Sequence, residues 1–200
     1  MSLTSQYDTK KSLISSYMDT SFDYKNTRFP GNSMGTCAAQ GLYWLMGLAG
    51  QISSGEGEKK ALLTTYQKAT ALQFGLLNNG EELTKICDSQ VDLRGKQKAE
   101  ALKSLTPYSG KYKLYGISNN KGEGHILGAY FPWSGRDQFY DPNLVAGPCT
   151  EDKWLWELLS MWPDLYTGVT NSNEANALWG FESLFVFSDP KKALEKLQAS

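Results

Sequence analysis

The fold is decided by the stretch Asn32-Ser-Met-Gly-Thr-Cys37-Ala-Ala-Gln-Gly-Leu-Tyr-Trp-Leu-Met46. Residues before Cys37 favour turns, whereas apolar residues recur at helical spacing on two faces from Cys37 onward. Two apolar faces predict a helix that is buried nearly all round, with Cys37 in its first turn. The positive end of a helix dipole favours a thiolate, which is the reactive form of cysteine. The sequence therefore predicts a reactive sulfur around which the rest of the chain is organised.

The composition fits one globular domain with a sizeable core, because 40% of the 200 residues are hydrophobic and 20% are charged. The formal net charge of −1 gives no reason to expect nucleic acid or an anionic membrane as a partner. No stretch approaches the ~20 apolar residues that span a bilayer, and the N-terminus lacks the apolar core of a secretory signal. Three cysteines do not form a disulfide framework, which fits a protein that works in a reducing compartment.

Helical patterns come first along the chain and strand patterns later, which predicts an α+β fold rather than alternating β-α-β units. A polar N-terminal arm that could be partly disordered is expected at residues 1–30, and a single domain at residues 31–200. Helices are expected from Cys37 to near Gly47–Gly50, at 58–77, 81–89 and 96–104, after Thr150 and at the C-terminus. Strands are expected at 111–117, 125–131, 136–140 and 181–187.

A nucleophilic cysteine needs a base within hydrogen-bonding reach and a third group that orients the base. His125 is the only histidine and stands at the head of a predicted strand, while Asp141 ends the next one. Because the start of one antiparallel strand lies beside the end of its partner, His125 and Asp141 are expected to be neighbours. Asn32, five positions before Cys37, is a candidate side-chain donor for an oxyanion hole, together with the Cys37 backbone N–H.

These residues resemble the YopT/AvrPphB-type cysteine peptidases, which are papain-like effector proteases of bacteria that live with animal or plant hosts. The similar motifs are Asn32…Cys37 at a helix start, Gly124-His125 leading a strand, and Phe139-Tyr140-Asp141-Pro142-Asn143. The resemblance implies a papain-like fold, a triad of Cys37, His125 and Asp141, and Asn32 as the oxyanion donor. It also implies a virulence effector that is secreted without a cleavable signal peptide and cleaves a protein in a host or target cell.

Other interpretations of the same residues stay open. A Cys-His-Asp triad can also deamidate glutamine or transfer an acyl group to an amine, since all three reactions pass through a thioester. The triad residues could instead be structural in a catalytically silent domain that binds a partner. A small cell-wall amidase is a further alternative, although such enzymes usually work outside the cytoplasm. No metal or other cofactor is expected, because one histidine and three scattered cysteines make no zinc pattern.

Several residues outside the triad are expected to be structural or simply exposed. Cys87, expected on a helix, and Cys149, expected in a Gly-Pro loop, are interpreted as structural. The tryptophans of the late helix, Trp154, Trp156 and Trp162, are expected in the core. Trp133 stands in a predicted turn close to the proposed site and is the best candidate for an exposed role. The sequence gives neither the substrate nor the oligomeric state.

Overall fold

A computed structural model of the chain describes residues 8, 12–19, 22–23, 37–50, 82–103, 110–120, 124–151, 154–166 and 178–198. Within this part, a seven-stranded antiparallel sheet has the strand order β1-β6-β5-β4-β3-β7-β2. The strands are β1 (Phe22–Asp23), β2 (Ser89–Asp92), β3 (Tyr112–Asn119), β4 (Gly124–Tyr130), β5 (Gln138–Asp141), β6 (Val145–Pro148) and β7 (Trp179–Phe187). The helices are α2 (Cys37–Leu48), α4 (Glu82–Ile86), α5 (Lys98–Lys103), α6 (Trp154–Tyr166) and α7 (Pro190–Gln198).

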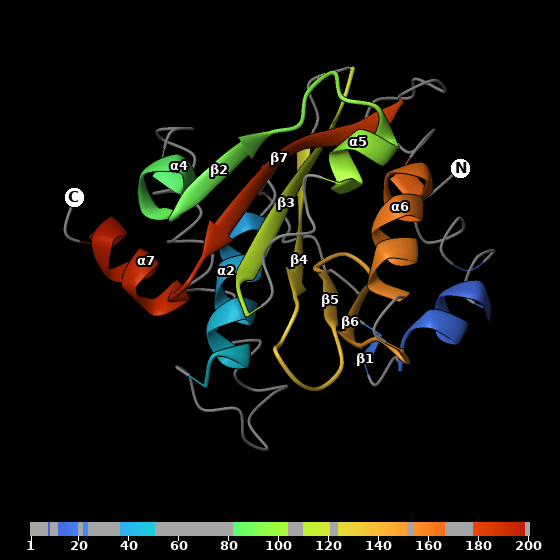
Figure 1. Ribbon diagram of the computed structural model, residues 1–200, viewed down its shortest axis with the longest axis horizontal. Coiled ribbons are helices and arrows are strands. Elements are labelled where there is room, and N and C mark those ends of the chain that lie inside the picture. Colours follow the sequence, from blue (N-terminus) through green and yellow to red (C-terminus); the bar gives the residue numbers. More distant parts are fainter. Residues whose placement is uncertain are drawn as a thin grey trace, which may run out of the picture.

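Helices cover both faces of the sheet (Figure 1). Side chains of α2, α4 and α7 form one hydrophobic core with β3 and β7. Side chains of α5, α6 and residues 12–19 form a second core on the opposite face. β3 contributes to both, because Leu114 lies in the first core and Tyr115 and Ile117 in the second, as the alternation of side chains along a strand requires. The α+β class predicted from the sequence is confirmed.

Three strands, β1, β2 and β6, are not predicted by the sequence patterns. The helix expected at 81–89 is wrong at its end, because α4 stops at Ile86 and the chain pairs with β7 as β2. β6 contains Gly147 and Pro148, two residues that disfavour strands, but its pairing with β5 overrides this local preference. The helix expected at 58–77 lies outside the described residues.

The described part of the N-terminal arm is joined to one edge of the sheet. β1 pairs with β6, and Met18 forms a bridge with Cys149. Ile14 and Met18 are buried in the second core, so this segment contributes to the packing around β6. The arm's expected boundary at residue 30 lies outside the described residues. No helix of the described part is both long and apolar enough to cross a membrane.

Candidate active site

The β4–β5 pair brings His125 and Asp141 together. The register aligns Gly128 with Tyr140, which places Asp141 at the level of Leu127 and His125 two residues further along β4. Alternate residues of a strand share a face, so His125 and Asp141 point to the same side, where α6 packs. Their side chains meet: His125 Nε2 lies 2.9 Å from Asp141 Oδ1, and the two side chains are 6% and 0% exposed. The expected neighbourhood of these residues is therefore observed.

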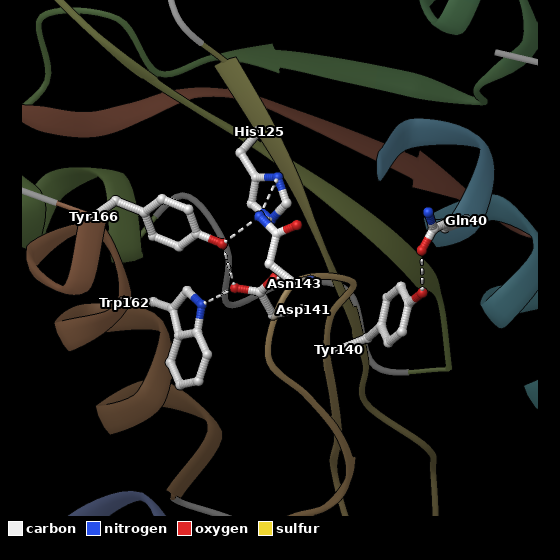
Figure 2. Close-up of polar contacts among 7 residues, drawn as sticks. All are labelled: Gln40, His125, Tyr140, Asp141, Asn143, Trp162 and Tyr166. Carbon is white, nitrogen blue, oxygen red and sulfur yellow. Dashed lines mark hydrogen bonds and ion pairs between the residues drawn. The ribbon is translucent and has the colours of Figure 1, made fainter. Parts of the chain in front are cut away.

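Each carboxylate oxygen of Asp141 receives two hydrogen bonds, and Figure 2 shows the two that come from Trp162 and Tyr166. Oδ1 accepts from His125 and from the backbone N–H of Asn143, the latter at 2.7 Å. Oδ2 accepts from Trp162 Nε1 at 2.5 Å and from the Tyr166 hydroxyl at 2.7 Å. Trp162 and Tyr166 both come from α6, whereas His125 comes from β4. A fully buried carboxylate is thus compensated by hydrogen bonds, as such a group requires.

Asn143 lies against the imidazole of His125. Its Nδ2 is 3.4 Å from both ring nitrogens, and this equal spacing puts the amide over the ring rather than in line with one nitrogen. The same Nδ2 donates to the Tyr166 hydroxyl at 3.0 Å. The Asp141–Asn143 backbone bond forms an Asx turn, which aims the Asn143 side chain back at the site.

Helix α2 packs against β3 and β4 over two glycines. A Cβ on Gly41 would come within 2.8 Å of Leu114 Cδ2, and one on Gly128 within 2.7 Å of two ring carbons of Trp44. Trp44 therefore lies directly on the backbone of β4, and its ring stacks on Tyr140 at a centroid distance of 5.0 Å. This close packing fixes the N-terminal end of α2 beside the start of β4.

Cys37 is the first residue of α2 and is partly buried, as expected for a helix-start thiol. Burial by itself raises the pKa of the Cys37 thiol. A hydrogen bond from His125, the charge of that imidazole and the backbone N–H groups of Ile126 and Ala38 outweigh burial and lower the pKa below its usual value. The sulfur therefore lies in a setting that favours the thiolate.

The pKa of the His125 imidazole is shifted in the opposite direction. Burial disfavours its charged form, but the Asp141 carboxylate and the Cys37 sulfur outweigh burial and raise the pKa of His125 to about 10. A sulfur with a lowered pKa beside an imidazole with a raised pKa favours a thiolate–imidazolium pair. Such a pair is suited to attack on a carbonyl carbon followed by proton transfer to the leaving group.

Sequence reasoning missed three residues of this site and named one that cannot be located. Trp162 was expected only in the core, Tyr166 was not singled out, and Asn143 was noted only as part of a motif. The spacing of four puts Trp162 and Tyr166 on one face of a helix, but ordinary core residues share this spacing, so it does not mark them as part of the site. Asn32, the expected oxyanion donor, lies outside the described residues.

Trp133 is exposed, as expected, but the prediction that it lies close to the site is wrong. It is 84% exposed and follows the end of β4, whereas His125 lies at the start of that strand. A strand advances about 3.3 Å per residue, so the length of β4 separates the two.

Cys149 bridges Met18 beside β6 instead of lying in an unpaired loop, and Cys87 follows the end of α4. Neither of these two cysteines forms a disulfide bond within the described part of the chain.

No protein-family model matches the sequence, and no curated protein matches it. A solved structure, that of the Pseudomonas avirulence protein AvrPphB, has a similar fold with a TM-score of 0.51 and 15% sequence identity. The superposition covers 83% of this chain and 97% of that protein. Its name is one of the two in the YopT/AvrPphB type that the sequence motifs resemble. The described part of this chain therefore has an AvrPphB-like fold, in which a helix that begins at Cys37 meets the sheet that carries His125 and Asp141.

Proposed function

We propose that this chain is a papain-like cysteine peptidase and a secreted bacterial effector that cleaves a protein of a host or target cell in its reducing cytoplasm. In this proposal Cys37 is the nucleophile, His125 the general base and acid, and Asp141 the group that orients the imidazole. Asn32 and the Cys37 backbone N–H are the proposed oxyanion donors. The AvrPphB-like fold supports the class of enzyme, and the contacts around His125 support the assignment of roles.

The single observation that carries the proposal is the placement of Cys37, the first residue of α2, beside the His125 imidazole, whose Nε2 lies 2.9 Å from Asp141 Oδ1. The directions of two pKa shifts agree with this placement. The pKa of the Cys37 thiol is lowered even though burial alone would raise it, and the pKa of His125 is raised even though burial alone would lower it. Perturbed groups that support each other in this way are typical of functional sites. A structural cysteine in a core has no need of a charged imidazole beside it.

The reaction would proceed through a thioester. His125 holds the proton of Cys37, and the thiolate attacks the carbonyl carbon of the scissile bond. The oxyanion that forms is stabilised by backbone and side-chain N–H donors. The imidazolium then gives its proton to the leaving amine, and the neutral imidazole removes a proton from the water that hydrolyses the thioester. Asp141 keeps the ring in one tautomer and orientation throughout.

The first test is the pH dependence of Cys37 alkylation by iodoacetamide, followed by mass spectrometry of each cysteine. We expect Cys37 to react rapidly near pH 6 and to lose this reactivity in His125→Ala, because the imidazolium stabilises the thiolate. Cys87 is an internal control, since burial raises the pKa of its thiol. Labelling of Cys37 no faster than Cys87, with no effect of His125→Ala, would sink the proposal and favour a partner-binding domain.

Turnover tests the same assignment. Cys37→Ala should abolish cleavage of any substrate found and leave the thermal transition in place, because the thiol is the only nucleophile in the proposed scheme. Activity that survives this substitution would rule out the mechanism. Deamidation and acyl transfer use the same thioester, and the mass of the product distinguishes them from cleavage.

A further inference from the structure

Tyr166 contacts each of the groups that surround His125 on the α6 side. Its hydroxyl donates to Asp141 Oδ2 at 2.7 Å and accepts from Asn143 Nδ2 at 3.0 Å. Its ring stacks on the imidazole of His125, with 5.0 Å between the centroids. The scheme above gives this residue no part.

The two oxygens of Asp141 have different partners. Oδ1 binds His125, whereas Oδ2 is shared by Tyr166 and Trp162, whose Nε1 lies 2.5 Å away. A hydrogen bond to a carboxylate stabilises its negative charge. Hydrogen-bond donors on Oδ2 therefore weaken the electrostatic attraction between Oδ1 and the imidazolium.

We propose that Tyr166 is a positioning residue that, together with Trp162, draws charge toward Asp141 Oδ2 and so limits how tightly His125 holds its proton. This inference rests on the proposed function, in which His125 must both release a proton and accept one. An imidazolium bound more tightly would protonate the leaving amine more slowly. It would also leave less neutral imidazole to activate water.

The titratable groups that face His125 are Asp141 from β5, Cys37 from α2 and Tyr166 from α6. Asp141 and Cys37 raise the pKa of His125 against the effect of burial. Burial and the Asp141 carboxylate raise the pKa of Tyr166 well above its usual value, so the phenol remains a neutral donor. Tyr166 can therefore act on His125 through Asp141 without changing its own charge.

The test is an NMR titration of His125 in the full chain, free of any histidine tag. Because the chain has one histidine, its imidazole signal needs no assignment. Tyr166→Phe removes the hydroxyl and keeps the ring, so we expect the pKa of His125 to rise by about half a unit, or about threefold tighter proton binding. An unchanged or lowered pKa would overturn the proposal.

The matched control is Tyr115→Phe. Tyr115 lies in the same core as Tyr166 and is 0% exposed, and its hydroxyl makes no hydrogen bond with any described residue. This substitution removes a buried hydroxyl without touching Asp141, so the pKa of His125 should not move. An equal rise in both variants would reduce the effect to a general change in packing and would contradict the assigned role.

A second variant keeps the test decisive if Tyr166→Phe does not fold. Tyr166→3-fluorotyrosine, introduced at this site alone, retains the hydroxyl and makes it a stronger donor. The pKa of His125 should then fall, and a rise would contradict the proposal. The titration needs no substrate, so it is independent of the proposed function. If Cys37 is alkylated no faster than an ordinary thiol, only the peptidase proposal fails. If Tyr166→Phe leaves the pKa of His125 unchanged, only the proposed role of Tyr166 fails.

Discussion

Among single residues, Asp141 is the one on which the site depends most after the cysteine and the histidine. It is 0% exposed and binds residues from β4, α6 and the turn that follows it. Its removal would leave the donors of Trp162 and Tyr166 buried without a partner, at about 1–3 kcal/mol each. A test of its chemical role must therefore keep the shape of the side chain.

Asp141→Asn is that test. The carboxylate charge is the largest of the effects that oppose burial, so without it the pKa of His125 should fall well below about 10. We expect turnover to fall by about 10²–10⁴-fold, because the imidazole loses its fixed tautomer. The pKa is measured by NMR on the single histidine and the rate by substrate cleavage.

His125→Ala should reduce turnover more than Asp141→Asn, because the base is lost and not only its orientation. The thermal transition of each variant serves as the control for folding. A loss at Asp141 as large as that at His125 would show that these roles are ordered wrongly.

Among the elements, the contact of α2 with β4 decides where Cys37 lies. Trp44 occupies the space that a side chain on residue 128 would need, and its ring is held by stacking on Tyr140. A Cβ on Gly41 would meet the ends of two flexible side chains, Leu114 Cδ2 at 2.8 Å and Ile126 Cγ2 at 3.5 Å, so a small rotation of Leu114 relieves the close contact. The two positions therefore differ in whether an added side chain can be accommodated.

Gly128→Ala should destabilise the protein by about 1–3 kcal/mol, because the stacked Trp44 ring cannot move without shifting α2. Alkylation of Cys37 should slow in the same variant, since the shift separates the helix start from His125. Gly41→Ala is the control: a gain in helix propensity of up to ~1 kcal/mol offsets the displaced Leu114. Urea denaturation measures both, and equal effects would show that the Trp44 contact is not the restraint.

Helix α6 stabilises the site through the oxygen of Asp141 that does not contact His125. Trp162 and Tyr166 are four residues apart and both reach Asp141 Oδ2. Pro163 lies between them and removes one helix hydrogen bond, which by itself predicts an end to the helix near that residue. Packing against the sheet carries the helix on to Tyr166, and this last turn delivers the hydroxyl.

For the whole molecule, the N-terminal segment is part of the fold that carries the site. Ile14 is 0% exposed in the core that includes Trp162 and Tyr166, whereas the adjacent Leu13 is 46% exposed. Ile14→Ala should therefore lower the free energy of unfolding by about 2–5 kcal/mol. Leu13→Ala, the neighbouring control, should change it by less than about 0.5 kcal/mol. Similar urea midpoints for the two variants would mean that the segment does not stabilise the domain.

The sequence by itself determined the class of fold, the helix that begins at Cys37 and the approach of His125 to Asp141. These depend on local signals: turn residues before an apolar helix, and two strand patterns joined by a short connection. Antiparallel pairing then makes the start of one strand a neighbour of the end of the next. Because the chain has one histidine, His125 was also the only imidazole that could be predicted as the base.

Only the tertiary structure decided what surrounds Asp141 and where the shorter strands lie. β2 and β6 are four residues each and have weak strand signals of their own. β2 forms because the chain pairs there with the longer β7, and β6 forms because it pairs with β5. Trp162 and Tyr166 have the same helical spacing as ordinary core residues. Their hydrogen bonds to Asp141 arise from how α6 packs on the sheet, and contacts between segments distant in sequence leave no local periodicity to detect.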